Sequence, residues 1–185
     1  MGVQIREDGV KYGAILIDPP WPFDGYVKKG VVPARGEQPY KTMQLYQIAG
    51  LPIPDLAAKN CAVFLCKNAS LPRAAQLLAD IWGFKIVTDD VLVWRKPSIG
   101  MGYWSRKDTE TVCLMKRGTP RRKSKGVRQS IEVPRREHSR KPDEIYSRIE
   151  ALVDGPYLEM FARQQWPGWD SWGNETSKFQ IQEAA

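Results

Sequence analysis

The stretch that decides the fold is Tyr12–Ile17, which reads YGAILI and runs directly into Asp18-Pro19-Pro20-Trp21. Six uncharged residues ended by two prolines predict a strand buried on both faces, because proline cannot continue a ladder of backbone hydrogen bonds. Ala62–Cys66 (AVFLC) has the same character and predicts a second buried strand. We therefore expect a sheet with elements packed on both of its faces.

Helical and strand patterns alternate along the rest of the chain. In Pro142–Val153, Pro142 suits the first turn, acidic residues follow it, and isoleucine and leucine side chains recur on one face. Alternation of this kind indicates an α/β domain with a largely parallel sheet. The other predicted helices are Met43–Ala49, Asp55–Lys59 and Leu71–Trp82, and the other predicted strands are Val91–Trp94, Thr111–Met115 and Tyr157–Phe161.

Length and composition favour one domain over residues 1–185, with a polar flexible tail at 176–185. No apolar run approaches the ~18 residues that a membrane span needs. The charged amino terminus lacks the apolar stretch of a secretion signal, so we expect a cytoplasmic protein and no membrane partner.

Scarce residue types exclude several kinds of chemistry. The only histidine is His138, so a site with several histidine ligands is excluded and a Ser-His-Asp triad would have to use that one residue. Cys61, Cys66 and Cys113 are too few for a four-cysteine zinc site. We interpret them as reduced thiols in or beside strands and expect no metal.

Positive charge is concentrated in Lys116–Lys141. This segment holds eleven Lys or Arg and two acidic residues, a net charge of +9, whereas the rest of the chain sums to −2. On charge alone, two interpretations of this segment are about equally favoured. It is either a solvated loop or a surface that binds phosphates.

The residues that end the first strand suit the methylation of an aromatic amine. The lone pair of such an amine is delocalised into its ring, so the amine is a poor nucleophile. The Asp18 carboxylate and the Pro19 carbonyl could hold both N–H hydrogens, while the ring stacks on Trp21. The alternative is a strand-ending turn plugged by an aromatic side chain, since a four-residue motif is only a hypothesis.

Several further motifs follow in a fixed order, and together they resemble a known family. The signature Asp18-Pro19-Pro20-Trp21 and the later segments are similar to the adenine-N6 methyltransferases that include the catalytic subunit of the mRNA adenosine methyltransferase and its bacterial and phage relatives. The resemblance covers Tyr12 to Glu175. The later segments are PYKTM from Pro39, VWRK from Val93, GYW from Gly102, KPDEIY from Lys141, LEMFAR from Leu158 and GN at Gly173.

The resemblance implies a class I, Rossmann-like methyltransferase fold in permuted motif order, with S-adenosylmethionine as cofactor. It implies that Asp18, Pro19, Pro20 and Trp21 hold the target adenine and are the catalytic residues. The cofactor-binding residues that it implies are Asp18, Lys141, Phe161, Arg163, Asn174 and Glu175. Two positions depart from the family pattern, where Ala162 replaces a glycine and Glu175 replaces a glutamine.

Substrate contacts follow from the same resemblance. Tyr40 would line the target pocket, Trp94 and Lys96 would border its entrance, and Tyr103 or Trp104 would lie near a flipped base. Loops 97–107 and 117–140 are the hypothesised nucleic-acid surface.

We therefore predict an S-adenosylmethionine-dependent N6-adenine methyltransferase acting on nucleic acid. DNA is favoured because compact members of the family are mostly bacterial or phage DNA enzymes. The alternatives are an RNA N6-adenosine methyltransferase and a non-catalytic nucleic-acid-binding subunit. Because the chain has no room for a large recognition domain, specificity must come from its loops, a homodimer or a partner subunit.

Overall fold

A computed structural model describes residues 9–22, 41–100, 104–137 and 140–179, with the side chains of residues 98–100 excluded. Within these residues the chain forms a seven-stranded sheet of order β5-β3-β4-β2-β1-β6-β7. The strands are β1 (Tyr12–Ile17), β2 (Ala57–Cys66), β3 (Lys85–Gly100), β4 (Lys107–Arg117), β5 (Ser130–Glu132), β6 (Tyr157–Met160) and β7 (Trp169–Trp172).

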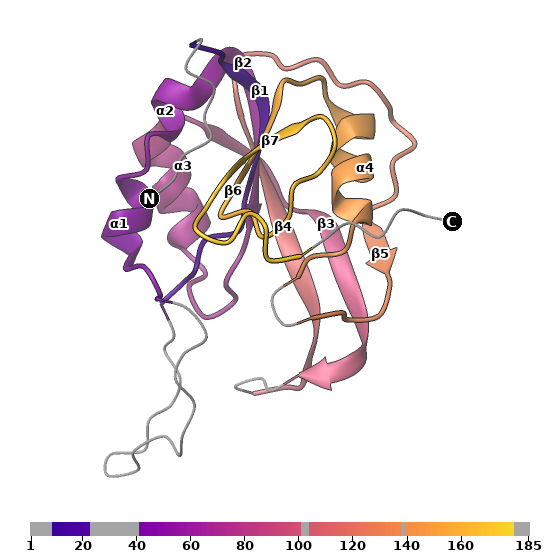
Figure 1. Cartoon of the computed structure of the whole chain (residues 1–185). Helices are drawn as coiled ribbons and strands as arrows, with labels where there is room; N and C mark the ends of the chain where they lie inside the picture. The colour runs from indigo at the N-terminus through magenta and orange to yellow at the C-terminus, as the bar shows by residue number, and fades with distance from the viewer. Residues whose placement is uncertain (1–8, 23–40, 101–103, 138–139, 180–185) are drawn as a thin grey trace.

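Helices cover both faces of the sheet, as the α/β prediction requires (Figure 1). Three helices lie on one face and α4 lies on the other (Figure 1). The helices are α1 (Leu45–Ala49), α2 (Ile53–Leu56), α3 (Ala74–Trp82) and α4 (Glu144–Leu152).

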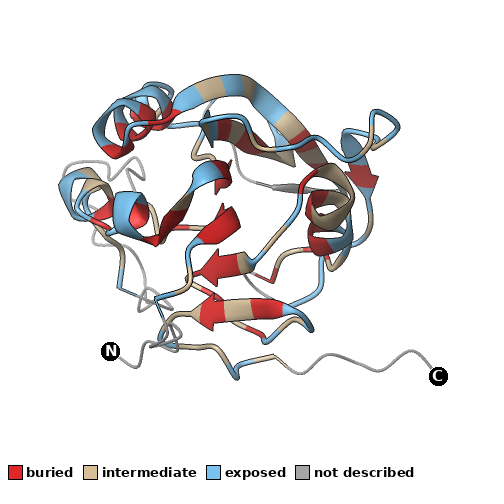
Figure 2. Ribbon diagram, turned by 90° about the horizontal axis from the view of Figure 1, so that it is seen from above, coloured by how far each residue is buried: buried red, intermediate tan, exposed pale blue. Residues whose placement is uncertain are grey.

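The first strand is the centre of the core. All six residues of β1 are buried, and β1 pairs in parallel with both β2 and β6. Its side chains alternate between two apolar clusters, so that Ile15 and Ile17 face α1, α2 and α3 while Ala14 and Leu16 face α4. Buried residues accordingly concentrate in the middle of the sheet (Figure 2). The prediction of a doubly covered strand at Tyr12–Ile17 is confirmed.

Four of the six strand pairs are parallel, and the two antiparallel pairs both involve β4. The mostly parallel Rossmann-like sheet is therefore confirmed. The hairpin of β3 and β4 extends past the other strands (Figure 1). As a result, part of the predicted loop at 97–107 is strand, since β3 runs to Gly100 and β4 begins at Lys107.

One predicted helix is partly wrong. The sequence predicts a helix over Asp55–Lys59, but α2 ends at Leu56 and β2 begins at Ala57. The guanidinium of Arg117 donates to the carbonyls of Ala57 and Ala58, which holds this stretch in the sheet. That contact is long-range, so local propensity could not reveal it. The short edge strands β5 and β7 were also not predicted.

The three cysteines lie in strands, as predicted. Cys61 and Cys66 are in β2 and Cys113 is in β4, and all three are buried free thiols. Burial raises the pKa of Cys61 and Cys113 to about 12, so both remain protonated at neutral pH.

Candidate active site

The carboxyl ends of the parallel strands bring Asp18 to the edge of the sheet. Asp18 directly follows β1, and its backbone N–H donates to Met160 O at the end of β6 at 3.5 Å. Ligands in open α/β sheets bind at this edge. Asp18 keeps a quarter of its side chain exposed although it follows a fully buried strand, so its carboxylate is accessible.

The turn after Asp18 is fixed by hydrogen bonds. Trp21 Nε1 donates to Cys66 O at the end of β2 at 2.9 Å, and Met43 N donates to Pro20 O at 2.8 Å. The Pro19 carbonyl accepts the Trp21 backbone N–H at 2.8 Å. Because a carbonyl oxygen has two lone pairs, Pro19 retains one acceptor site for a ligand.

Lys141 is the centre of the charged cluster. Its Nζ lies 3.0 Å from Asp18 Oδ2 and 2.8 Å from Glu110 Oε2. Burial lowers the pKa of Lys141, but the negative groups around it, Asp18 above all, outweigh this effect and raise the pKa well above its ordinary value. The lysine is therefore a permanent cation beside the Asp18 carboxylate.

Glu110 was not predicted from the sequence. It lies where β4 runs past the carboxyl end of β2, opposite Trp94 of β3, and it forms ion pairs with both Lys96 and Lys141. Burial raises the pKa of Glu110, but Lys141 and Lys96 overcome this and hold it at about 2. The sequence shows Glu110 as one of several acids in a strand, and only the antiparallel register identifies it.

One hollow lies beside Asp18 on the side of β6. Its lining combines two carboxyl groups, three cations and two phenyl rings with an amide and a phenol. The lining residues are Asp18, Arg140, Lys141, Tyr146, Glu159, Phe161, Arg163, Gln164 and Phe179. The Oε1 atom of Gln164 is buried and accepts no hydrogen bond among the described residues.

This donor set fits S-adenosylmethionine. Its carboxylate needs a cation, its ammonium and sulfonium groups need acidic or carbonyl oxygens, and its adenine needs an apolar ring face. In this hollow Lys141 supplies the cation, Asp18 supplies the acidic oxygens and Phe161 supplies the apolar ring face. The unsatisfied Gln164 oxygen is a further acceptor for a polar ligand.

A second hollow lies on the other side of Lys141. It is lined by residues of β2, β3, β4 and β5 and by the start of α4. Its walls include Cys66, Trp94 and Glu110, and Lys141 lines both hollows. Trp94 is buried, its Nε1 donates to Val133 O at 2.9 Å, and Lys96 Nζ lies 4.7 Å from its ring centroid.

A tight backbone turn follows β6. Phe161 has a left-handed backbone with φ of 63°, and its ring meets Trp172 edge-on at 5.0 Å. A Cβ at Gly173 would lie 2.8 Å from Ala162 O, so glycine is required there. The absence of a side chain at Gly173 therefore allows its backbone to approach that of Ala162 closely.

The last predicted cofactor residues lie next to this turn. Arg163 Nε is 3.3 Å from Glu175 Oε2, and Arg163 O accepts the Phe179 N–H at 2.9 Å. Arg163 lines the first hollow, whereas Glu175 adjoins it through Arg163 and Asn174 is exposed. Phe179, within the predicted flexible tail, lines the first hollow and lies 5.4 Å from the Arg140 guanidinium.

A buried polar network forms the floor of the first hollow. Tyr146 Oη donates to Glu159 Oε2 at 2.9 Å, and Gln164 Nε2 donates to Tyr146 Oη at 3.2 Å. Burial raises the pKa of Glu159 to about 8, so it carries a proton at neutral pH. Both Tyr146 and Glu159 fall within segments that the sequence identified, but their roles were not predicted.

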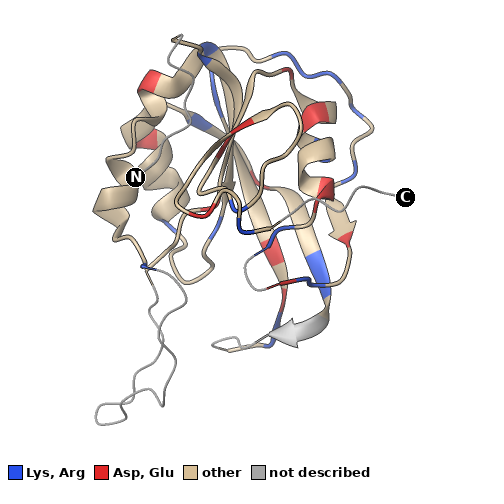
Figure 3. Cartoon of the chain, viewed as in Figure 1, with Lys and Arg blue, Asp and Glu red and all other residues tan. Residues whose placement is uncertain are grey.

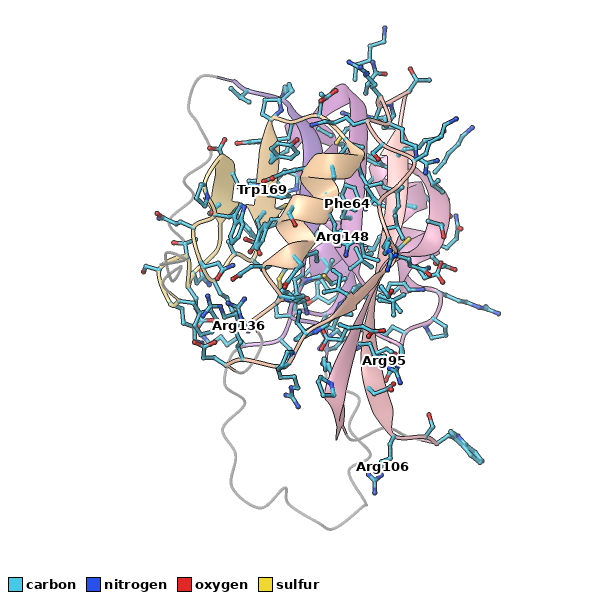
Figure 4. The ribbon with its side chains drawn as sticks, turned by 90° about the vertical axis from the view of Figure 1, so that its right-hand side faces the viewer. Phe64, Arg95, Arg106, Arg136, Arg148 and Trp169 are labelled. Atoms are coloured by element: carbon cyan, nitrogen blue, oxygen red, sulfur yellow. The ribbon has the colours of Figure 1, made fainter. Side chains whose placement is uncertain are left out.

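Some predicted substrate residues lie away from these hollows or outside the described residues. Tyr40 and Tyr103 lie outside the described residues, as does His138. Trp104 is 94% exposed and lies near the end of the β3–β4 hairpin. Arg106, two residues later, marks that end of the hairpin in Figure 4.

The basic segment divides into three parts. Residues 118–129, which we call the strap, cross the face that holds α4, then β5 joins the sheet edge, and the third part comprises the residues after β5, of which 133–137, 140 and Lys141 are described (Figure 3). Near the site several cations are paired, as Arg136 is with Asp143 and Arg140 with Glu137. The strap itself contains five basic and no acidic residues.

No group of three or more potential ligands for a metal occurs among the described residues. In the same part of the chain, no helix is long and apolar enough to cross a membrane.

Comparison with known proteins places this arrangement in a family. The family model MT-A70 matches residues 12–175, which include the Asp18 turn, Lys141 and Glu175. The chain belongs to the MT-A70 family. Its class I methyltransferase fold therefore agrees with the sheet described above.

Individual MT-A70 relatives extend the comparison. The chain is 30% identical to the "Type II methyltransferase M.MunI" of a Mycoplasma species, over 89% of this chain and 78% of that protein. It is 28% identical to the human "N(6)-adenine-specific methyltransferase METTL4", over 91% of this chain and 38% of the relative. It is 27% identical to the human "N(6)-adenosine-methyltransferase catalytic subunit METTL3", over 89% of this chain and 28% of the relative. The chain thus spans most of the bacterial relative but well under half of the two human ones.

Proposed function

We propose that this protein is an S-adenosylmethionine-dependent N6-adenine methyltransferase that modifies specific sites in DNA. The observation that carries the proposal is the Asp18–Lys141 pair, which lies between two hollows in a chain that matches MT-A70 from residue 12 to 175. The match to most of the length of the bacterial M.MunI supports DNA as the substrate.

The first hollow suits the cofactor, because its lining of Asp18, Lys141, Phe161 and Arg163 has the donor set for S-adenosylmethionine. The cofactor supplies a methyl group on a sulfonium, which is electrophilic without any metal. The flipped adenine would lie at the turn after β1, where Trp21 Nε1 donates to the carbonyl of Cys66, a residue that also lines the second hollow.

The residues of the turn would orient the target amine. Asp18 and the free lone pair of the Pro19 carbonyl would accept its two N–H groups, and Trp21 would stack on its ring. Trp21 is suited to this because its Nε1 bond to Cys66 O fixes the indole against the end of β2. Holding the amine in this way aims its lone pair and reduces the entropy lost in reaching the transition state.

The neighbouring charges would keep the Asp18 carboxylate in place to accept a hydrogen bond from the target amine. Lys141 neutralises part of the Asp18 charge, and Glu110 with Lys96 fixes Lys141 from the other side. Lys141 is also the cation within reach of the cofactor carboxylate. Lys96 and Glu110 therefore act as positioning residues in this proposal.

Nucleic acid would be held by the hairpin around 97–107 and by the basic segment at 117–140. Trp104 is exposed enough to stack on a base, and the strap offers cations for phosphates. A homodimer or a partner subunit would supply the remaining sequence specificity. Cytoplasmic location stays a prediction from the sequence.

The test is transfer of a labelled methyl group from S-adenosylmethionine to DNA and to RNA, with nucleoside analysis of the product. N6-methyladenine in DNA supports the proposal, whereas labelled RNA alone would support an RNA enzyme. Asp18→Ala should abolish transfer while the circular dichroism spectrum is unchanged. Binding of nucleic acid without binding of S-adenosylmethionine, measured by calorimetry, would instead indicate a non-catalytic subunit.

A further inference from the structure

A large cavity lies under the strap, away from Asp18. Its volume is about 350 Å³, which lies near the lower end of the range of ligand pockets in proteins. Its floor is the sheet face of β2, β3 and β4, its roof is the strap, and one wall is the end of α4. The lining residues are Ala62, Phe64, Val87, Thr88, Val91, Leu114, Lys116, Pro120, Arg122, Val127, Leu152 and Val153.

The cavity exists because α4 is too short to cover the sheet. Its nine residues span about 14 Å, whereas β3 alone has sixteen residues. Figure 4 faces this side of the molecule, with Arg148 on α4 and Phe64 on the sheet beside it. The strap covers part of the sheet face that α4 leaves uncovered, since residues of the strap and of the sheet line the same cavity.

The strap is held in place at several points, so the space beneath it is maintained. Thr119 N donates to the Asn60 side chain at 2.9 Å, and Lys123 N donates to Leu152 O at 2.9 Å. Near its end, Arg148 donates to Arg128 O at 3.0 Å. The strap is thereby fixed to β2 and to the middle and the end of α4.

The chemistry of the lining selects a narrow class of ligand. Nine of the twelve lining residues are apolar, Thr88 is the only neutral polar one, and the two charged ones, Lys116 and Arg122, are both cations. A sugar or nucleobase would bury several polar groups without partners, which is costly. An apolar body satisfies the walls, and one anionic group satisfies the cations.

Positive charge at the mouth is reinforced by its neighbours. Lys85 lies directly opposite Lys116 in the β3–β4 pair, so both side chains are on the same face. Asp154 forms an ion pair with Lys123, and Asp90 accepts a hydrogen bond from Thr88. Neither acid lines the cavity, and no described acid forms an ion pair with Lys116.

We propose that the cavity under the strap binds a small apolar monoanion, such as an acyl or aryl carboxylate, with its anionic group at Lys116 and Arg122. The site is independent of methyl transfer, since it shares no lining residue with either hollow at Asp18.

The probe for this site is 1-anilinonaphthalene-8-sulfonate, which combines aromatic rings with one anionic group. We expect saturable fluorescence enhancement with one site per full-length chain at a pH where the protein is folded. Decanoate and 2-naphthoate, added separately, test whether the site takes an acyl or an aryl carboxylate. At least one of them should displace the probe. Adenosine monophosphate and S-adenosylmethionine should not displace it.

A matched pair of charge reversals locates the site. Lys116→Glu should weaken probe binding about tenfold, which corresponds to about 1.4 kcal/mol. Lys59→Glu, an exposed lysine of β2 outside the lining, should leave binding unchanged. Val127→Phe, which fills the cavity from the strap, should also abolish the site. If that variant fails to fold, the two lysine variants still decide.

Several outcomes would overturn the proposal. Equal affinities of the two lysine variants would show that the probe binds elsewhere. Displacement by S-adenosylmethionine would place the probe in the hollow beside Asp18. Non-saturable fluorescence would indicate loosely packed surface and no site. None of these results would bear on methyl transfer, which is measured separately.

Discussion

The Lys141 ammonium lies 3.0 Å from Oδ2 of Asp18. The family resemblance gives Lys141 a role toward the cofactor alone, whereas Asp18 would hold the target amine as well as contact the cofactor. Their direct contact means that the two reactant sites share one ion pair. Glu110 extends the pair, because its Oε2 atom lies 2.8 Å from Lys141 Nζ. The three charged side chains therefore form one connected cluster. A substitution at any of the three should therefore affect both reactants.

Removal of the Lys141 cation should impair both binding and transfer. In Lys141→Met, Asp18 would lose its ion pair, Glu110 would keep only Lys96, and the cofactor carboxylate would lose its partner. We expect the Kd for S-adenosylmethionine to rise about tenfold or more, measured by calorimetry, and methyl transfer to fall further. Lys123→Met, which removes an ion pair with Asp154 far from the site, is the control. A Kd equal to that of the control would remove Lys141 from the cofactor site.

Glu110 should make the protein sensitive to acid. Its pKa is held at about 2, below the ordinary value of 4.5, because Lys141 and Lys96 overcome the effect of burial. A depressed pKa contributes stability above pH 4.5 that is lost as the pH falls from 4.5 toward 2. In urea unfolding, Glu110→Gln should therefore reduce the free energy of unfolding at pH 6 by about 1–2 kcal/mol, discounted for partial exposure, and should lose less on acidification than the native chain. If the free energy of unfolding changed with pH in the same way for Glu110→Gln and for the native chain, the prediction would be wrong.

The sequence predicts the parts of this site that are contiguous in the chain. A buried strand followed by Asp18-Pro19-Pro20-Trp21 places Asp18 at the sheet edge, and the family resemblance names Lys141 as a cofactor residue, which the structure brings to 3.0 Å from Asp18. Glu110 was missed because its position depends on the antiparallel register of β4, which shifts its side chain past the end of β2. The strap cavity was missed for a similar reason, since a basic segment does not reveal which apolar face it covers.

The predicted helix at Asp55–Lys59 shows the same limit. Pro52 and Pro54 and the following residues favour a helix locally, and α2 does form over Ile53–Leu56. The strand that follows is determined by pairing with Tyr12 and by hydrogen bonds from Arg117, which lies sixty residues later. Such long-range contacts override a short local preference.

Glu159 should make the protein less stable as the pH rises from about 4.5 to about 8. Burial raises its pKa to about 8, so the folded protein binds a proton that the unfolded chain releases near pH 4.5. The stability from this group is complete below pH 4.5 and is lost as the pH rises through 8. Glu159→Gln keeps a partner for the Tyr146 hydroxyl without titrating. We expect a flatter profile of unfolding free energy between pH 5 and 9, by a few kcal/mol. An unchanged slope would mean that Glu159 is ionised in the folded state.

Trp104 should serve substrate binding and contribute nothing to stability. It is 94% exposed, so Trp104→Ala removes little packing and should leave the Tm unchanged. Stacking of a base on an aromatic ring contributes about 1–3 kcal/mol, so we expect at least a fivefold rise in the Kd for nucleic acid by fluorescence anisotropy. Tyr46→Ala, which removes an aromatic ring 74% exposed on α1, is the matched control and should not change the Kd. Equal effects of the two variants would exclude a specific role for Trp104.

The last prediction tests whether the strap binds the phosphates of nucleic acid, and it uses two of the basic residues of the strap. Arg122 and Lys123 are unsuitable because the Arg122 side chain lines the cavity under the strap and the Lys123 side chain forms an ion pair with Asp154. Arg121 and Lys125 are both exposed and form no described ion pair. Arg121→Glu with Lys125→Glu should weaken nucleic-acid binding and reduce the slope of log K against log salt concentration by about 1 for each phosphate that the strap no longer neutralises.

A control on the opposite face separates local binding from net charge. Lys59→Glu with Arg73→Glu changes the total charge by the same amount, and both residues are exposed on elements outside the basic segment. Long-range attraction by net charge would weaken binding equally in both double variants. Direct binding through the strap would instead change the salt slope only when Arg121 and Lys125 are reversed. Identical slopes would return the strap to the interpretation of a solvated loop, and nucleic acid would then have to be held by the hairpin.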